Sequence, residues 1–258
     1  MEKKLHGLCF SLGDVPVSEK LAALDFTAQR AKWIRMYGVE DHPRYAHGCG
    51  LKVAAGAHLT NDPEECAHTM QRLINACNRR EVDLAVVGNE TLLHGTLSAE
   101  DLIGYVKHCR RHVHKRIKVT FAETAKDIIA HPEIIEAADV VGMHHYPFWD
   151  GVPIDSALAD LILRYKEVKV LAGKKKVIIL ESGWPTGGTK KYPVENDRAV
   201  ASVENAKRYW EEFTSWADAD KVDYFMFEMW DEPWKEQYEG SCGGKWGRFV
   251  WPTLIQKY

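Results

Sequence analysis

The chain alternates between short apolar runs and longer segments in which apolar residues recur with helical spacing. Eight apolar runs, rich in β-branched residues, lie at residues 8–12, 33–37, 51–56, 83–88, 117–122, 140–145, 177–181 and 224–229. Most of them are continuously apolar, which is typical of parallel strands that are covered on both faces. Segments with helical period lie at residues 18–30, 62–80, 102–114, 155–171 and 196–216.

Two of the helical segments begin with start signals. Asp62 precedes a proline and two acidic residues, and Ser98 precedes an acidic turn, so both are expected to cap the helix that follows. Eight strands alternating with helices predict an α/β fold, a compact (β/α)8 TIM barrel that spans residues 1–258 as one domain without a large extra subdomain. An open doubly wound sheet is the alternative, but Ser11-Leu12-Gly13-Asp14 is not the glycine-rich turn that usually follows its first strand.

The composition narrows the possible partners. The 258 residues are 45% apolar and 28% charged, with a net charge of −3, and basic residues form no stripe, so we expect no nucleic-acid partner. No apolar run reaches the length that spans a bilayer.

The six cysteines form no Cys-x-x-Cys pair, which favours buried thiols, although their even number leaves a disulfide open. The N-terminus has no signal-peptide core, so we expect a cytoplasmic protein, or a secreted or periplasmic one if a leader has been removed.

Two acidic side chains stand where barrel enzymes place their catalytic groups, at the carboxyl ends of strands. Glu90 follows the fourth apolar run, and Glu181 ends the seventh. A charge at such a position is costly unless it is paired or used, so we interpret both residues as catalytic. Two carboxylates on separate strands suit glycoside cleavage, with Glu90 as acid/base and Glu181 as nucleophile, roughly 5–5.5 Å apart in a retaining enzyme. Arg35 and Lys235 are the cations that we expect to keep Glu181 ionised.

Three strand ends also carry distinctive motifs. The fourth ends in Val87-Gly88-Asn89-Glu90, followed by Leu92-Leu93, and the seventh continues as Glu181-Ser182-Gly183-Trp184-Pro185. The eighth runs through Phe227-Glu228-Met229-Trp230-Asp231-Glu232-Pro233-Trp234-Lys235. Together, and in this order, they resemble the acid/base, nucleophile and strand-eight motifs of glycoside hydrolase family 17, in its compact microbial form. The resemblance extends from the first strand to Trp246-Gly247.

This resemblance implies a (β/α)8 barrel, retention of anomeric configuration and a β-1,3-glucan substrate. It implies that Asn89 hydrogen-bonds the 2-hydroxyl of the sugar beside the cleaved bond, a contact that can strengthen in the transition state. The other candidate substrate-binding residues, which lie at or just beyond strand ends, are Tyr37, Tyr146, Trp149, Asp150, Trp184, Glu228, Asp231, Glu232 and Lys235.

The expected reaction is hydrolysis of β-1,3-glucan by double displacement, with β-1,3-glucanosyl transfer as the alternative. Trp149 bears on this choice, because its ring can either stack an acceptor sugar or pack the loop. A metal-dependent barrel hydrolase is more distant: His144 and His145 follow strand six, but the first strand offers only His6 in place of His-x-His. A non-catalytic glucan-binding barrel is less consistent with two intact glutamate motifs. We expect a monomer that binds β-1,3-glucan oligo- or polysaccharide and uses no cofactor and no metal ion.

Overall fold

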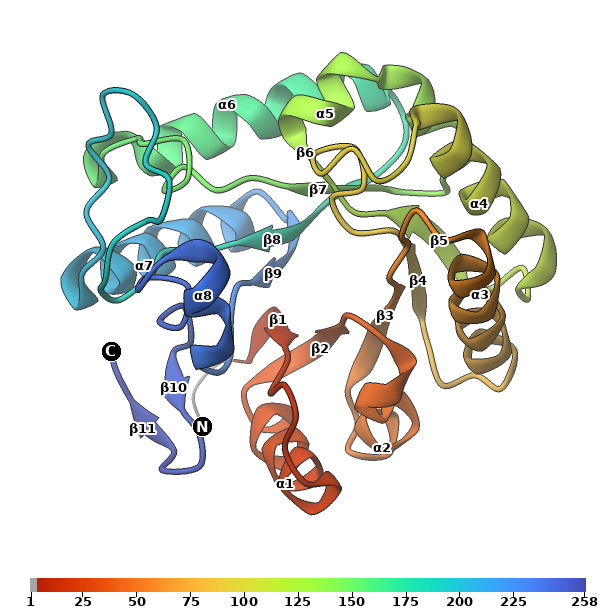
Figure 1. Cartoon of the computed structure of the whole chain (residues 1–258), viewed down its shortest axis with the longest axis horizontal. Coiled ribbons are helices and arrows are strands. Elements are labelled where there is room, and N and C mark those ends of the chain that lie inside the picture. The colour runs from red at the N-terminus through yellow and green to blue at the C-terminus, as the bar shows by residue number, and fades with distance from the viewer. Residues whose placement is uncertain (1–3) are drawn as a thin grey trace.

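Parallel strands form one sheet that curves round to meet itself. The computed structural model describes residues 4–258. Within them the main sheet contains β1 (Leu5–Phe10), β2 (Ala31–Met36), β3 (Lys52–Ala57), β4 (Leu84–Val87), β5 (Lys118–Phe121), β6 (Glu123–Thr124), β7 (Val141–His144), β8 (Val177–Ser182) and β9 (Asp223–Met226). Their order is β5–β4–β3–β2–β1–β9–β8–β7–β6. Only Ala122 separates β5 from β6, so the two are one interrupted strand, and the sheet closes as the predicted (β/α)8 barrel (Figure 1).

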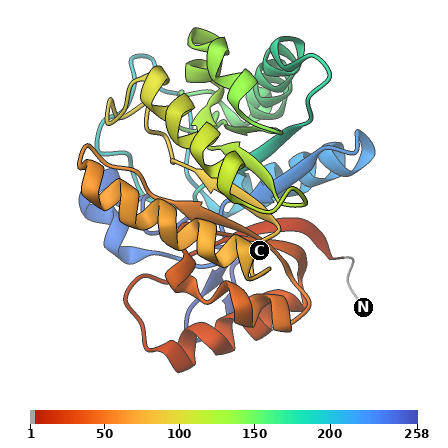
Figure 2. The same ribbon diagram turned by 90° about the vertical axis from the view of Figure 1, so that its right-hand side faces the viewer.

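Helices cover the outside of this barrel. The α-helices are α1 (Val17–Ala28), α2 (Pro43–Gly48), α3 (Pro63–Asn78), α4 (Ala99–His112), α5 (Ala125–Ala130), α6 (Ile154–Ala172), α7 (Val203–Ala219) and α8 (Glu236–Glu239). Three 3-10 turns are η1 (Val39–Asp41), η2 (Pro132–Ala137) and η3 (Pro233–Lys235), and a short antiparallel pair is formed by β10 (Phe249–Val250) and β11 (Ile255–Gln256). Neighbouring helices pack side by side, as α3 and α4 do in Figure 2.

The two predicted helix starts are confirmed. The Asp62 side chain accepts hydrogen bonds from the backbone N–H groups of Glu64 and Glu65, and Ser98 forms a reciprocal capping box with Asp101. These side chains satisfy N–H groups that have no partner within their own helix. The helix boundaries of α3 and α4 are thus encoded locally.

One predicted helix is too long. The segment 196–216 was expected to be helical throughout, but α7 begins at Val203, because the Ser202 side chain accepts a hydrogen bond from the backbone N–H of Asn205 and caps the helix there. Residues 183–202 instead form a long loop without helix or strand. The predicted final loop, residues 232–251, also differs, since it contains η3, α8 and β10.

The interior is apolar apart from the groups near the mouth of the barrel. All six cysteines are free thiols, and five of them are buried, as predicted. Among residues 4–258, no helix combines the length and the apolar character needed to cross a bilayer. The pairing of β7 with β8 shifts register beside His144, which comes to lie opposite Glu181. Such irregularities often re-aim side chains at active sites.

Candidate active site

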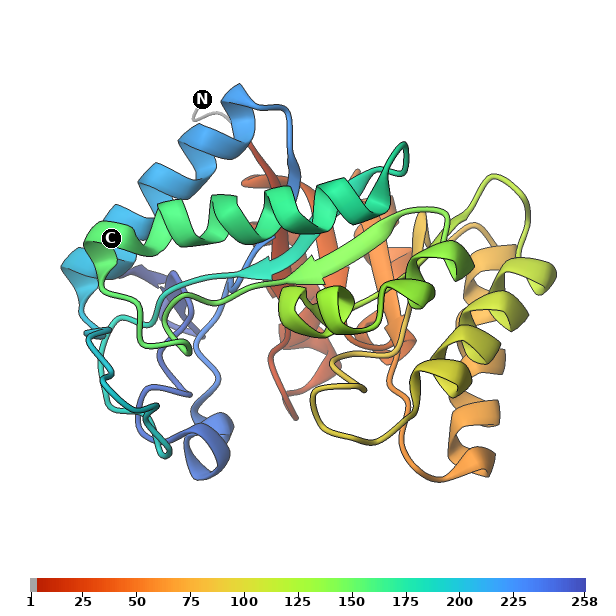
Figure 3. The same cartoon turned by 90° about the horizontal axis from the view of Figure 1, so that it is seen from above.

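The carboxyl ends of the strands open into one cavity of about 1120 Å³. Pockets for drug-sized ligands usually span about 300–1,000 Å³, so this one has room for several linked sugars. It is formed by loops that lie along the lower edge of Figure 3, with α8 on one side and the segment joining β4 to α4 on the other. The predicted site residues that line it are Tyr37, Asn89, Glu90, Tyr146, Trp149, Asp150, Glu181, Glu232 and Lys235.

Glu181, on β8, is buried and its carboxylate is held on several sides. It is 5% exposed, and its Oε1 pairs with Arg35 and accepts a hydrogen bond from Tyr37 Oη at 2.9 Å. Tyr146 Oη donates to the other oxygen, Oε2, at 2.5 Å. Burial by itself raises the pKa of Glu181, but the Arg35 guanidinium, His144 and the two tyrosine hydroxyls outweigh it and lower the pKa to about 2. Glu181 is therefore ionised at neutral pH, as a nucleophile must be.

Arg35 connects the strand ends that carry Glu181 and Asn89. It lies on β2, is almost fully buried, and donates from Nη2 to Asn89 Oδ1 at 2.6 Å in addition to its ion pair with Glu181. The expectation that Arg35 stabilises the ionised Glu181 is confirmed. Because the Asn89 oxygen is occupied by Arg35, the NH2 group of Asn89 is the part left to donate to a sugar hydroxyl.

Glu90 lies on a tight turn directly after β4. Its backbone has a φ of 52°, in the left-handed region, and its N–H donates to the carbonyl of Ala122 at 2.7 Å. Non-glycine residues adopt this conformation at some energetic cost, and they do so mainly where the surroundings fix them. The turn directs the carboxylate toward β7, where Oε1 lies 2.7 Å from His144 Nδ1. The Glu90 side chain is 18% exposed, so it can exchange protons with solvent.

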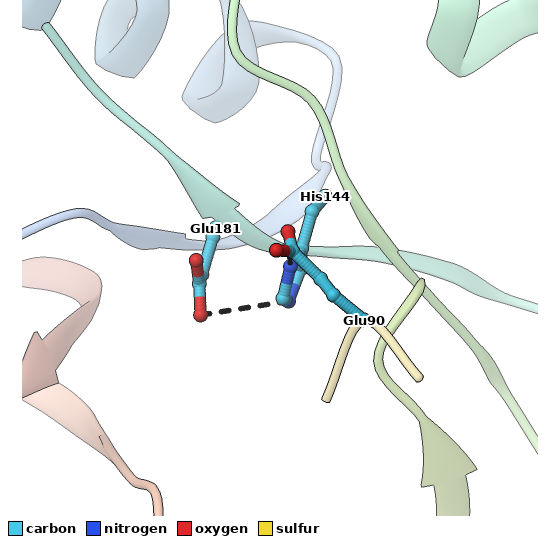
Figure 4. A group of neighbouring side chains, drawn as sticks. All are labelled: Glu90, His144 and Glu181. Atoms are coloured by element: carbon cyan, nitrogen blue, oxygen red, sulfur yellow. Dashed lines mark hydrogen bonds and ion pairs between the residues drawn. The ribbon is translucent and has the colours of Figure 1, made fainter. Parts of the chain in front are cut away.

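His144, at the end of β7, lies between the two carboxylates (Figure 4). Its Nδ1 faces Glu90, and its Nε2 lies 3.6 Å from Glu181 Oε1. A carboxylate oxygen of Glu90 and one of Glu181 lie within 4.8 Å of each other. Carboxyl groups are roughly 5–5.5 Å apart in retaining glycosidases and roughly 6.5–9.5 Å apart in inverting ones. The spacing fits the retaining arrangement. The sequence analysis considered His144 only as a metal ligand and did not predict that it lies between the two carboxylates.

Glu123, on β6, is a second residue that the sequence analysis missed. It is fully buried, and its carboxylate accepts hydrogen bonds from the Thr91 N–H and hydroxyl at 2.9 and 2.6 Å and from the Leu92 N–H at 3.2 Å. Burial raises the pKa of Glu123 to about 7, although these hydrogen bonds oppose the shift. The side chain thus fixes the two residues that follow Glu90. The available signal was an acidic residue placed immediately after the fifth apolar run.

Trp149 and Asp150 lie farther along the cavity, after β7. The half-buried Trp149 ring lies 5.4 Å from the ring of Trp246, at an interplanar angle of 41°. Asp150 is exposed, and its Oδ2 lies 3.9 Å from Nδ1 of His145. The other ring nitrogen of His145, Nε2, lies 2.6 Å from Asp160 Oδ2, so His145 is hydrogen-bonded beside the cavity.

Lys235 does not stabilise Glu181, contrary to expectation. The turn η3 brings Lys235 back onto Glu232, with which it forms an ion pair, and its Nζ lies 3.5 Å from Glu228 Oε2. These two carboxylates raise the pKa of Lys235 against the opposing effect of burial. Burial, together with the nearby Glu232, raises the pKa of Glu228 far above its usual range. Glu228 is therefore uncharged at neutral pH, and Lys235 balances the single negative charge of Glu232 at the wall of the cavity.

Three predicted substrate-binding residues do not reach the lining of the cavity. Trp184 is 2% exposed, and its Nε1 donates to the Val200 carbonyl at 2.9 Å, so it anchors the loop 183–202. Glu228 is fully buried behind Lys235. Asp231 faces away toward Lys257, whose Nζ lies 2.7 Å from its Oδ1. These side chains organise the segments that form the cavity, and the structure does not place them among the residues that line it.

Glu90, His144 and Glu181 each offer one atom that could bind a metal ion, and these three atoms lie within 4.8 Å of one another. Arg35, however, already places a cation on Glu181 Oε1, and a second positive charge at that oxygen is electrostatically disfavoured. The histidine is moreover engaged by Glu90 at hydrogen-bond distance. The arrangement fits a pair of catalytic carboxylates better than it fits a metal centre.

Comparison with known proteins agrees with this geometry. Residues 15–247 match the BtgE/BtgC glycoside hydrolase domain, so the chain belongs to this family of glycoside hydrolases. It is 33% identical over 180 residues to a probable glucan endo-1,3-beta-glucosidase, btgC, of Aspergillus fumigatus, covering 63% of this chain and 26% of that protein. The corresponding protein of Aspergillus terreus is 27% identical over 218 residues, with 76% and 33% covered. The chain thus spans about a quarter to a third of these curated relatives.

Solved structures with the same fold include enzymes of the family indicated by the sequence motifs. A glycoside hydrolase family 17 β-1,3-glucanosyltransferase from Rhizomucor miehei superimposes with a TM-score of 0.83 at 23% identity, covering 95% of this chain and 93% of that one. An endo-laminarinase from Formosa gives a TM-score of 0.81 at 16% identity, with 95% and 83% covered. At these identities the likeness supports the barrel fold, and the resemblance to family 17 noted in the sequence is consistent with it.

Proposed function

We propose that this domain cleaves β-1,3-glucan with retention of configuration, through a covalent glucosyl-enzyme on Glu181. The observation that carries the proposal is the convergence of Glu90 and Glu181, whose oxygens lie within 4.8 Å at the floor of a cavity large enough for an oligosaccharide. The names of the curated relatives, glucan endo-1,3-beta-glucosidases, support the substrate class and attack at internal bonds. We expect one copy of the chain to suffice, because both carboxylates line a single cavity within it.

In the first step, Glu90 gives its proton to the glycosidic oxygen while a Glu181 oxygen attacks the anomeric carbon. The glycosidic bond breaks, and the departing chain leaves with the proton. In the second step, Glu90 takes a proton from water, and the resulting nucleophile displaces Glu181. Arg35 and Tyr37 hold Glu181 Oε1 in place, and the free NH2 group of Asn89 faces the cavity for the sugar 2-hydroxyl.

Transfer to a second sugar is the alternative outcome of the second step, and one feature favours it. Trp149 is half-buried in the cavity lining, where it is backed by Trp246, so part of its ring is available to an acceptor sugar. Pyranose C–H faces stack on flat aromatic rings, and a bound acceptor excludes water from the glucosyl-enzyme. Transfer then replaces hydrolysis without any change in the residues that perform the chemistry.

A product time course on laminarihexaose tests the proposal. We expect shorter laminari-oligosaccharides, initially as β-anomers by NMR, and longer ones in addition where transfer occurs. Initial α-anomers would contradict retention, and absence of any product would contradict the substrate class. The same reaction with a chelator separates the metal-dependent alternative, because only that mechanism predicts loss of activity. Laminarin binding without product formation would instead indicate a glucan-binding barrel.

A further inference from the structure

Three aromatic side chains on one wall of the cavity are exposed although their positions are well fixed. Tyr192 is 77% exposed, Trp234 48% and Tyr238 62%, and all three line the cavity that contains Glu181. Trp234 is the only exposed one among the nine tryptophans, all of which lie within residues 4–258. Exposed apolar groups that cluster in this way usually mark a binding surface.

Trp234 and Tyr238 form a fixed corner. Their ring centroids are 6.4 Å apart at an interplanar angle of 75°, and Trp234 Nε1 donates to Glu232 Oε1 at 3.2 Å. Gly13, with a φ of 61°, lies directly beside the indole, since a Cβ there would approach its ring to 3.1 Å. The glycine thus lets the loop after β1 support the tryptophan. A ring fixed on one side and open on the other can stack a sugar at little cost in conformational entropy.

Tyr192 belongs to a different loop, which is tied to the same wall. The adjacent Lys191 donates from its backbone N–H to the Glu239 carbonyl and from Nζ to the Gln237 carbonyl, both at 2.9 Å. These bonds join the loop 183–202 to α8. The three aromatic residues therefore form one wall built from two segments, which we call the aromatic wall (Tyr192, Trp234 and Tyr238).

The aromatic wall lies across the cavity from the acid/base. Glu90 belongs to the segment that joins β4 to α4, which Figure 3 shows on the side away from α8. Leu93 and His94 follow Glu90 and line the cavity on that side. Since Glu90 protonates the oxygen of the departing sugar, the departing chain lies toward Leu93 and His94. The sugars that remain attached to Glu181 then extend the other way, toward the aromatic wall.

We propose that the aromatic wall, with Trp234 at its centre, binds a glucosyl unit of the retained part of the glucan, at a distance from the cleaved bond. This inference rests on the proposed β-1,3-glucan activity and makes it more specific, because it predicts that efficiency grows with the length of the retained chain. The occupant is a neutral sugar whose C–H face contacts the indole and whose hydroxyls reach the two tyrosine hydroxyls. The wall thereby favours long glucans over short ones.

Substrates with a constant leaving group and a variable retained chain test this inference. We would measure kcat/KM for 4-methylumbelliferyl laminaribioside and laminaritetraoside with the wild-type protein, Trp234→Ala, Tyr238→Ala and Trp234→Phe. The expected result is a tetraoside-to-bioside ratio that falls about tenfold in Trp234→Ala, as for loss of one central contact, and that Trp234→Phe largely restores. Tyr45→Ala is the matched control, because Tyr45 is an exposed aromatic residue on α2 outside the cavity.

The outcomes separate the two proposals. If the wild-type protein cleaves neither substrate, the proposed activity fails. If it cleaves both and the ratio in Trp234→Ala equals the wild-type ratio, the aromatic wall has no such role. An equal loss on both substrates also overturns the inference, because Trp234 would then act through Glu232 and Lys235 on the catalytic groups. Melting temperatures of all variants identify any loss that comes from unfolding.

Discussion

The two carboxylates that we propose as catalytic occupy very different surroundings, although both lie at the same cavity. Glu181 is buried, paired with Arg35 and hydrogen-bonded by Tyr37 and Tyr146. Glu90 has one close partner, His144, and its side chain is more exposed to solvent. Both nevertheless come from apolar strands of the same barrel.

This difference matches what each group must do in a double displacement. A nucleophile has to stay ionised and aligned, which a buried cation and two hydroxyl donors ensure. An acid/base has to lose and regain a proton in every cycle, which requires contact with solvent or with the incoming nucleophile. The chain therefore uses a rigid network at one carboxylate and a hydrogen-bonded but accessible turn at the other.

The contrast is tested most severely by Glu181→Gln. The amide cannot attack the anomeric carbon, so we expect release of reducing sugar from laminarin to fall by at least about 10⁴-fold. The melting temperature should fall as well, because Arg35 stays buried without its anionic partner. Glu136→Gln is the control, since Glu136 is an exposed carboxylate at the other end of the barrel. Substantial turnover by Glu181→Gln would remove Glu181 from the chemistry.

Glu90→Ala should give the next largest loss, about 10²–10⁴-fold on laminarin. The loss should shrink with a dinitrophenyl glycoside, because that leaving group departs without protonation. Azide should then accelerate turnover, since it can enter the space left by the side chain and attack the glucosyl-enzyme without a general base. Equal losses on both substrates, with no effect of azide, would show that Glu90 is not the acid/base.

Sequence reasoning located both carboxylates because their signal is local. Each stands at or close to the carboxyl end of an apolar strand, and parallel strands of a barrel bring their carboxyl ends to one face. Arg35 was found in the same way, since it precedes the carboxyl end of β2. The fold followed from the spacing of eight apolar runs. The largest errors of extent were in α7 and the final segment, and β1 begins at Leu5 although its apolar run was placed at residues 8–12.

The missed features depend on contacts between segments far apart in the chain. His144 lies between the carboxylates because the β7–β8 pairing places it opposite Glu181, and no sequence pattern gives that register. Trp184 belongs to the most distinctive motif, yet the loop 183–202 folds back and buries it against Val200. Lys235 was assigned to the wrong carboxylate because its direction depends on the turn η3.

Glu123 tests the surroundings of Glu90, because its carboxylate holds the turn that carries Glu90, the more accessible of the two carboxylates. In Glu123→Gln the NH2 group cannot accept the hydrogen bond from Leu92, so the turn shifts and Glu90 is misplaced. We expect kcat on laminarin to fall between about ten- and a hundredfold, with a smaller loss on the dinitrophenyl glycoside. Thr91→Val, which removes only the hydroxyl contact, should show the same dependence more weakly. An equal loss on both substrates would mean that Glu123 acts on the fold alone.

The pH dependence of activity tests the buried network around Glu181. The pKa of Glu181 is lowered to about 2 from 4.5, so this group stabilises the fold above pH 4.5, and that contribution is lost as the pH falls toward 2. Tyr146→Phe removes a hydrogen bond that favours the ionised form. The acid limb of kcat/KM should then move to higher pH by about one unit, with Tyr45→Phe unchanged. An unmoved acid limb would assign it to a different group.

The smallest effect is expected from Trp149→Ala, which alters neither carboxylate. Its ring lines the cavity and is backed by Trp246, so its loss should weaken acceptor binding while the glucosyl-enzyme still forms. Consumption of laminarihexaose should change little, and the ratio of longer to shorter products should fall about two- to tenfold, the effect of losing one modest aromatic contact. An unchanged ratio would leave Trp149 as a packing residue. In that case the choice between water and sugar would be made elsewhere along the departing-chain side, where Leu93 and His94 are the next residues to vary.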